Sequence, residues 1–436
     1  MPQNLIRLKG AVQEYDWGKE GSQSMVARLA PNAIGGEFKL EESKSYAEVW
    51  MGTHQNGPAH LFSDPSTPLL SVISSQPKHY LGEALLRKWP GTTHIPYLFK
   101  ILSCQKALPL QVHPDKELAK HLSEKDPEAF VDPNHKPEIA VSIGEPIDNG
   151  AWGEGIAFTG FVGFQPIGRI REYIKSIPEL RGALGNDPVA ELFVSCKPDE
   201  EKERLKQIYS LILRRPQNEV ARHVRSLVDR IGEGDWPSDP TSKELGRLVI
   251  KVNEQYPGDV GVFSTVFFMN FIKLQRGESV YIGADEIHAY LEGDIIECMA
   301  ISDNVLNVAF VPPEERQVDD FLRALTFTAR DKDHWLLRHE SYSKSKEGKT
   351  QVYAPPCEEF IVLGTSLGKD GMETLDAVGG PTIGIVTQGR IRVIVGKERE
   401  ELDTGGIIFV APGNEIQVEH LEWGTEGEIW WASTVV

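Results

Sequence analysis

The sequence lacks the features of a membrane or secreted protein. No stretch approaches the roughly 18 consecutive apolar residues that a membrane-spanning helix needs. Residues Met1 to Gly10 are polar and interrupted, without the apolar core of a secretory signal. Only four cysteines are present, far apart and without a C-x-x-C pair: Cys104, Cys196, Cys298 and Cys357. We therefore expect reduced thiols in a cytoplasmic protein that does not contact a membrane.

Positive charge is also scarce. The chain has 46 Lys and Arg against 64 Asp and Glu, which gives a formal net charge of −18. A surface of this sign repels the phosphates of nucleic acids and of anionic membranes. We expect no nucleic-acid partner, and an anionic small molecule would need a local basic pocket.

The apolar residues indicate strands first and helices later. The chain has 436 residues, a length that suggests two or three domains. Short apolar runs between Gly and Pro, such as Ile95 to Leu102 and Ile139 to Ile143, predict strands in the first 165 residues. From Gly168 to about Glu254, apolar residues recur at helical spacing instead. The strand pattern returns from Val262 to Ile301.

A third region begins near residue 330 and again favours strands. Phe360 to Leu363, Ile383 to Val386 and Ile391 to Val395 are strand candidates, with turns at Gln388-Gly389 and Pro412-Gly413. The predicted fold is mainly β with a helical insert, consisting of two cupin or jelly-roll barrels plus an α-helical domain. The expected domains are a catalytic cupin (1–165 with 257–330), a helical insert (166–256) and a C-terminal cupin-like barrel (331–436).

Three short, separated stretches have the residue pattern of one metal site. They read Leu110-Gln111-Val112-His113, Lys136-Pro137-Glu138 and Glu286-Ile287-His288-Ala289-Tyr290. Alternate side chains of a strand share one face, which pairs Gln111 with His113, Lys136 with Glu138, and His288 with Tyr290. Two imidazoles, one carboxylate and one amide oxygen suit zinc, and no thiolate is needed. Each residue alone is more often structural, because a lone histidine at a strand end is seldom a ligand.

Residues around this pattern suit carbonyl chemistry. Lys136 would stabilise an oxyanion or move a proton, although a surface ion pair is the commoner use of such a lysine. Glu297 follows an apolar pair, and burial would raise its pKa toward that of a base. Asp303 and Asn304 are equally compatible with a plain turn. Tyr46, Glu48 and Trp50 alternate on one strand, where they would line a sugar site or pack in the core.

Seven segments of the chain resemble type I phosphomannose isomerases of the eukaryotic kind. The segments are Tyr15 to Lys19, Tyr46 to His54, Leu98 to Ser103, Gln111 to Lys116, Asp132 to Glu138, Asn253 to Asp259, and His288-Ala289-Tyr290 with Glu297 to Ala300 and Ser302 to Asn304. They extend from the amino terminus to about residue 312, and the C-terminal strands fit the family's second cupin barrel.

The resemblance implies a zinc enzyme that interconverts mannose 6-phosphate and fructose 6-phosphate through a cis-enediol, with one Zn²⁺ per chain. The implied partner is a small-molecule sugar or sugar phosphate. The implied ligands are Gln111, His113, Glu138 and His288. The implied acid–base positions are Glu297, Lys136 and Asp303, with Asn307 at a further active-site position. The substrate-binding candidates are Lys100, Trp17 and Tyr290.

The chain departs from the family at three positions of the implied site. Asn307 stands where the family has an arginine, Pro313 where it has a lysine, and Pro109 where it has a serine. All three missing groups are of kinds that bind a phosphate or an oxyanion. Losing one charge-assisted contact costs about 1.5–3 kcal/mol, which is roughly ten- to a hundredfold in binding or rate.

Two function classes therefore remain. The first is a working aldose–ketose isomerase, which the intact metal ligands favour. The second is a divergent metal-binding cupin paralogue with an altered, unphosphorylated substrate or no catalysis, which the three departures favour. An iron oxygenase with a two-histidine, one-carboxylate triad is a weaker option, because Gln111 would fill a position that oxygen needs.

Overall fold

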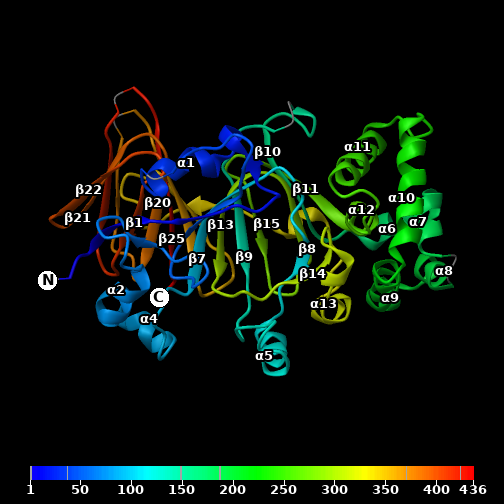
Figure 1. Cartoon of the computed structure of the whole chain (residues 1–436), viewed down its shortest axis with the longest axis horizontal. Coiled ribbons are helices and arrows are strands. Elements are labelled where there is room, and N and C mark those ends of the chain that lie inside the picture. The colour runs from blue at the N-terminus through cyan, green and yellow to red at the C-terminus, as the bar shows by residue number, and fades with distance from the viewer. Residues whose placement is uncertain (1, 37, 148–149, 186–187, 370, 423) are drawn as a thin grey trace.

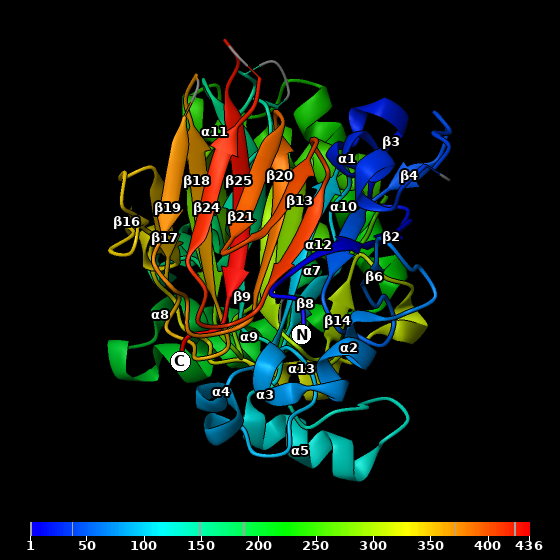
Figure 2. The same ribbon diagram turned by 90° about the vertical axis from the view of Figure 1, so that its left-hand side faces the viewer.

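Stacked β-sheets form most of the molecule, and a group of helices lies at one end (Figure 1). The computed structural model describes residues 2–36, 38–147, 150–185, 188–369, 371–422 and 424–436. From left to right, Figure 1 shows the C-terminal strands, the central sheet and the helical group. Figure 2 shows the C-terminal strands from outside, with the central sheet behind them.

The central sheet has eleven strands, all paired antiparallel. Strand β13 lies in its middle and pairs with β7, β8, β9 and β10. The strands are β2 (Ala11–Gln13), β5 (Glu48–Met51), β7 (Tyr97–Cys104), β8 (Leu110–Val112), β9 (Glu138–Ser142), β10 (Ile156–Phe164), β11 (Met269–Gln275), β12 (Ser279–Ile282), β13 (His288–Ala300), β14 (Leu306–Ala309) and β15 (Leu336–Leu337).

An eight-stranded sheet and a four-stranded sheet follow on the C-terminal side. In order across the larger sheet the strands are β16 (Glu340–Ser341), β17 (Thr350–Tyr353), β18 (Ile361–Leu367), β25 (Gly427–Ser433), β20 (Thr382–Gln388), β23 (Ile407–Val410), β1 (Leu5–Lys9) and β6 (His60–Leu61). The smaller sheet is β19 (Met372–Leu375), β24 (Ile416–His420), β21 (Ile391–Val395) and β22 (Glu398–Leu402). Strands β3 (Lys19–Glu20) and β4 (Ser45–Tyr46) form a separate pair.

The helices fall into two groups. Around the sheets lie α1 (Met25–Ala33), α2 (Leu69–Ser75), α3 (Pro77–Tyr80), α4 (Glu83–Lys88), α5 (Lys116–Lys125) and α13 (Val318–Ala324). The helical group at the far end consists of α6 (Ile167–Ser176), α7 (Pro178–Ala183), α8 (Pro188–Ser195), α9 (Glu201–Leu213), α10 (Gln217–Gly232), α11 (Pro240–Gln255) and α12 (Gly261–Val266). None of the described helices is long and apolar enough to cross a membrane.

Apolar side chains from facing layers hold this arrangement together. Val141 of β9 and Ile296 of β13 share a core with Ile383 of β20 and Phe409 of β23, so the central and eight-stranded sheets pack face to face. Another core lies between the eight- and four-stranded sheets. The largest core joins the helical group to β10 and β14. The molecule is therefore mainly β with a helical region, as the sequence pattern predicted.

The strand pairings of the described residues leave each sheet open at its ends. Closure into cupin barrels therefore stays a prediction. Two parts of the prediction were wrong. Residues 1–165, expected to be strands joined by loops, also contain the helices α1 to α5. Val262 to Val266 was expected to begin a strand region but forms helix α12. Every residue of that helix is buried, so its apolar run has no polar side that would distinguish a helix from a strand.

Candidate metal centre

Three of the four metal ligands expected from the sequence, the two histidines and the glutamate, lie at strand ends. His113 directly follows β8, Glu138 is the first residue of β9, and His288 is the first residue of β13. Strand β12 ends at Ile282, which pairs with Glu138, and the loop 283–287 then leads to His288. Because Ile282 already lies opposite Glu138, this short loop keeps His288 close to the start of β9.

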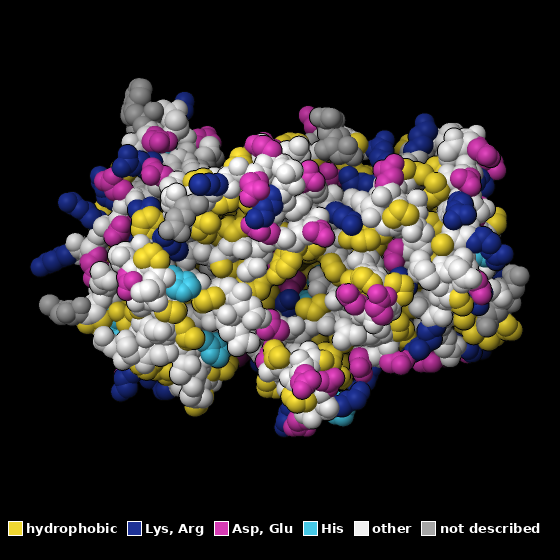
Figure 3. All heavy atoms as spheres, viewed as in Figure 1, with side chains coloured by type: hydrophobic (Ala, Val, Ile, Leu, Met, Phe, Trp, Pro, Cys, Tyr) yellow, Lys and Arg dark blue, Asp and Glu magenta, His cyan; other side chains and the backbone are white. Residues whose placement is uncertain are grey.

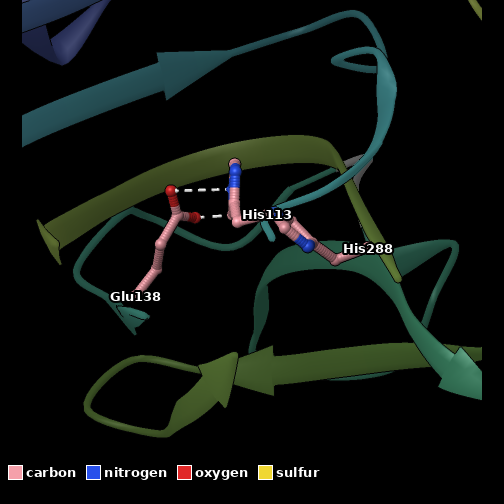
Figure 4. A group of neighbouring side chains, drawn as sticks. All are labelled: His113, Glu138 and His288. Carbon is pink, nitrogen blue, oxygen red and sulfur yellow. Dashed lines mark ion pairs between the residues drawn. The ribbon is translucent and has the colours of Figure 1, made fainter. Parts of the chain in front are cut away.

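The three side chains converge on one point (Figure 4). Their ligand atoms all lie within 4.8 Å of one another. The Nε2 atom of His113 is 3.2 Å from one carboxylate oxygen of Glu138, and Nε2 of His288 is 3.5 Å from the other. Both Nε2 atoms are buried and neither makes a hydrogen bond. Buried polar atoms are normally paired, so two unpaired nitrogens facing one carboxylate fit a bound cation.

Backbone carbonyls fix the tautomer of both rings. The Nδ1 atom of His113 lies 2.9 Å from the carbonyl oxygen of Asn304, and Nδ1 of His288 lies 3.0 Å from that of Glu286. A carbonyl only accepts hydrogen bonds, so each Nδ1 carries the proton and each Nε2 keeps a free lone pair. This outer contact orients metal-binding histidines in proteins generally.

The local electrostatics give His113 and Glu138 the protonation states that metal ligands need. Burial, together with the nearby Lys136 ammonium, lowers the pKa of His113 to about 4. Burial alone would raise the pKa of Glu138, but Lys136 and the two imidazoles hold it well below its usual value. Near neutral pH the ring is therefore neutral and the carboxylate charged, as cation binding requires.

Gln111 is placed beside these ligands by strand register. It pairs with His288 across β8 and β13, and with Asn307 across β8 and β14. Directly opposite residues of antiparallel strands have side chains on the same face, about 4.5–5.5 Å apart at Cβ. The Gln111 side chain therefore lies on the same face as His288. Two imidazole nitrogens and a carboxylate suit zinc, and the amide oxygen of Gln111 would complete the four-ligand set expected from the sequence.

Lys136 and Glu297 both take part in buried ion pairs near the ligands. Lys136 lies 3.3 Å from Glu138, and Lys100 lies 3.0 Å from Glu297 and 3.4 Å from Glu48. All five side chains are buried. Burial raises the pKa of Glu297 to about 7, although Lys100 acts in the opposite direction. Burial would lower the pKa of Lys100, but Glu297 and Glu48 raise it above its usual value.

Asp303 is more exposed and lies on a pocket that polar and apolar side chains line together. Its carboxylate is 3.1 Å from Nε2 of His54 and 3.2 Å from Nδ2 of Asn56. The contact with His54 is the main reason why the pKa of Asp303 lies below its usual value. A cavity of about 310 Å³ opens here and includes Asp132.

Asn304 is a structural clamp rather than part of a plain turn. Its side-chain Nδ2 donates to the carbonyls of Asp132 and Asn134, both at 2.8 Å. Its backbone carbonyl accepts a hydrogen bond from Nδ1 of His113. The loop before Glu138 and the ring of His113 are therefore tied to the same residue.

The aromatic candidates line the same region in different ways. Trp17 stacks on the exposed Tyr15 at 5.4 Å between ring centroids. Tyr290 is buried beside His288, at 5.8 Å between centroids, and its hydroxyl has no hydrogen-bond partner. Tyr46 instead packs in the core against Phe38.

Neutral residues occupy the three positions where the family resemblance implied Arg, Lys and Ser. The Oδ1 atom of Asn307 is buried and makes no hydrogen bond. Pro313 begins an exposed 3-10 turn, and Pro109 lies just before β8.

The face in Figure 3 is hollowed near its middle, over the central sheet, with both acidic and basic side chains inside.

The residues that the sequence did not reveal act mostly through the backbone or in pairs. The carbonyls of Asn304 and Glu286 orient the imidazoles, and no side-chain pattern marks a carbonyl. His54 joins Asp303, and Glu48 joins Lys100, across long sequence separations. Glu48 had a weak signal, because it alternates with Trp50, whose Nε1 donates to it at 2.6 Å.

Gly163 supports His288 from the neighbouring strand. Its N–H donates to the carbonyl of Ile287, at 2.8 Å, and its φ is +58°. A Cβ there would lie 1.9 Å from the Trp335 ring. We expect Gly163→Ala to lower the free energy of unfolding by about 2–5 kcal/mol, since overpacking costs about 1–3 and left-handed backbone about 1–2.

Urea unfolding measures this effect, and Gly168→Ala is the matched control. Gly168 is exposed in α6, and nothing lies within 4 Å of a Cβ built there. This control is expected to be stabilised by about 0.5–1 kcal/mol. Equal stabilities of the two variants would contradict the close packing at Gly163.

Family models match two parts of the chain. Residues 5–151 match the catalytic domain of type I phosphomannose isomerase, and residues 184–269 match the helical insertion domain of the same family. The mannose-6-phosphate isomerase of Eremothecium gossypii is 35% identical over 430 residues, and that of Saccharomyces cerevisiae is 34% identical over 430 residues. Each alignment covers 96% of both chains.

Solved structures share the fold. A mutant of phosphomannose isomerase from Salmonella typhimurium superposes with a TM-score of 0.80 at 20% identity, over 100% of both chains. A structure described as mannose 6-phosphate isomerase bound with zinc and yttrium gives 0.79 at 21% identity, again over 100% of both chains.

Proposed function

Because the chain belongs to the type I phosphomannose isomerase family, we propose that it is a zinc-dependent aldose–ketose isomerase. Its proposed reaction interconverts mannose 6-phosphate and fructose 6-phosphate through a cis-enediol, and relatives of similar length carry the name of that activity. The observation that carries the proposal is the convergence of two unpaired imidazole nitrogens on one buried carboxylate.

We assign the metal to His113, Glu138 and His288, with Gln111 as the fourth ligand. A bound zinc ion would supply Lewis acidity to the substrate oxygens, and a structure of the same fold is described as zinc-bound. With one anionic ligand the centre keeps a net positive charge, which favours the negative charge that develops on the substrate oxygens.

Glu297 is our candidate for the base that moves the carbon-bound proton. As a carboxylate it would take the proton from C2 of the aldose and return it to C1. Lys100 lies 3.0 Å from this carboxylate and holds it in place. The pKa of Glu297, about 7, suits a base at neutral pH. The proton added at O1 and the proton removed from O2 need a second group. Lys136, next to Glu138, and Asp303, on the pocket described above, are the candidates.

Substrate contacts are assigned to Lys100, Trp17 and Tyr290. The hydroxyl of Tyr290 is buried without a partner, so it is free to bond to a substrate oxygen. The stacked pair of Trp17 and Tyr15 offers an aromatic face to the sugar.

We also propose that the fold is a double cupin with the domain bounds predicted above and that the protein is cytoplasmic. We further propose that it has no nucleic-acid partner, and the net charge of −18 supports this last point.

The runner-up is a metal-binding relative that acts on an unphosphorylated sugar or on none. Asn307 favours it, because this residue, opposite Gln111 in the neighbouring strand, is a neutral amide whose side-chain oxygen makes no hydrogen bond. Lys100 and Lys136 are both already paired with carboxylates. Neither is therefore free to neutralise a phosphate without loss of an existing contact.

One set of assays tests both readings. Metal content is measured first, and then isomerisation of mannose 6-phosphate is compared with that of mannose. We expect turnover of the phosphorylated sugar. Zinc binding without turnover of either sugar would refute the isomerase, and turnover of mannose alone would favour the runner-up.

Asn307→Arg is expected to raise kcat/KM for mannose 6-phosphate by roughly ten- to a hundredfold, the effect of one charge-assisted contact. Asn307→Gln is the matched control, because it lengthens the side chain without adding charge. Its kcat/KM should stay close to that of the wild type. An equal gain in both variants, or an equal gain on unphosphorylated mannose, would show that the phosphate is not the group recognised.

A further inference from the structure

Glu359 connects the C-terminal region of the chain to the segments that carry the metal ligands. It lies in the loop before β18, and its side chain is buried. Its Oε1 accepts from Nε2 of His135 at 2.7 Å and from Nζ of Lys116 at 3.3 Å. Its Oε2 accepts from the backbone N–H of Glu358 at 3.1 Å, so the second carboxylate oxygen is also held.

Both contacted residues lie close in sequence to a proposed ligand. Lys116 comes three residues after His113 and begins helix α5. His135 comes three residues before Glu138. Pro114 and Pro137 lie within these two connections and restrict φ there. A shift at Lys116 or His135 is therefore passed along a stiff backbone to the ligand beyond it.

Glu359 is ionised at neutral pH. Burial would raise the pKa of Glu359, but His135 and Lys116 lower it to about 2. The contact with His135 is the stronger of the two, because the Lys116 side chain is 57% exposed and its ion pair is screened by water. The His135 side chain is only 21% exposed.

Glu359 therefore holds the two ligand-bearing segments at a fixed separation. We propose that Glu359 is a positioning residue that sets the spacing of His113 and Glu138 and thereby the affinity of the metal centre. The inference rests on the proposed metal centre. It gives the C-terminal sheets a role in metal binding, beyond covering the apolar face of the central sheet.

The test measures metal affinity directly on the full chain. Metal-free protein is titrated with Co²⁺, whose visible d–d bands report both affinity and coordination geometry. We expect Glu359→Gln to weaken Co²⁺ binding by up to about tenfold, less than the 10- to 100-fold lost with a partner that bonds a ligand directly, with altered band intensities. Glu359→Asp retains the charge and should recover part of the affinity.

Glu358→Gln is the matched control. This neighbouring carboxylate is 74% exposed and lies 3.5 Å from Lys88. Its loss should leave the Co²⁺ affinity and spectrum unchanged. Thermal unfolding of each metal-free variant separates a general loss of stability from a specific loss of affinity. Wild-type affinity and bands in a folded Glu359→Gln protein would overturn the proposal.

His135→Gln tests the same contact from the other side, so the proposal stays testable if Glu359→Gln does not fold. It should weaken Co²⁺ binding in the same direction, and unchanged affinity in this variant would refute the proposal. If the double variant of Glu359→Gln with His135→Gln folds, its loss of Co²⁺ binding free energy should be smaller than the sum of the two single losses. Both substitutions remove the same contact. Additive losses would also refute it. Failure of the wild-type protein itself to bind Co²⁺ would instead refute the metal centre.

Discussion

Glu138→Gln is expected to abolish tight metal binding and to lower kcat by at least about 1,000-fold. The substitution preserves the shape of the side chain but removes the single negative charge shared by both imidazoles. A Lewis acid contributes several kcal/mol to such a reaction, and each 1.4 kcal/mol is about tenfold in rate. Metal analysis after dialysis and steady-state assay of mannose 6-phosphate isomerisation measure the two effects.

Glu145→Gln serves as the control for this variant. Glu145 lies in the same segment, shortly after β9, but its side chain is exposed. Its metal content and kcat should match those of the wild type. A Glu138→Gln protein that keeps both metal and activity would show that the three converging side chains are not the metal centre. Loss of metal without loss of activity would show that the metal is not used in the reaction.

Glu297→Gln is expected to lower kcat by about 10²- to 10⁴-fold, the usual contribution of a general base, with a smaller change in KM. Lys100 keeps Glu48 as a partner in this variant, so the ammonium is not left buried alone. In the wild type, the base is active as a carboxylate. Because burial raises the pKa of Glu297 to about 7 in the substrate-free protein, kcat/KM should fall as the pH is lowered through about 7.

A pH profile of kcat/KM distinguishes a base from a merely structural residue. The acid limb near pH 7 should disappear in Glu297→Gln, and the residual rate should vary little across that range. Glu292→Gln is the control, since Glu292 lies on the same strand but pairs with Lys251 near the helical group. An unchanged acid limb in Glu297→Gln would assign the titrating base to another group.

Much of the architecture could be predicted from local pattern. Apolar residues such as Ile170 and Ile174 recur at helical spacing and are buried in α6. Ile391 to Val395 alternates between buried and partly exposed residues in β21, with the predicted bounds. Helix α12 was missed because it is buried on every side, and periodicity is absent from such a segment. Closure of the sheets depends on curvature, which short strand patterns do not encode.

The metal ligands could be nominated from the sequence for a chemical reason. Each candidate lies in a short stretch of alternating residues typical of a strand, and His113, Glu138 and His288 do converge in the fold. The four-ligand set and the roles of Gln111, Lys136, Glu297 and Asp303 stay predictions. Only the fold revealed that Lys100 is held between two carboxylates, since Glu48 and Glu297 are 249 positions apart in the chain.

The sequence by itself determined the mainly β character with a helical region, the sign of the net charge and the candidates for the metal-binding side chains. Each of these depends on residue type and short-range spacing, which a single chain displays directly. The tertiary structure decided which backbone carbonyls orient His113 and His288, and that Glu359 reaches His135 from the C-terminal region. Contacts of this kind depend on how distant segments pack, and packing is a property of the whole fold.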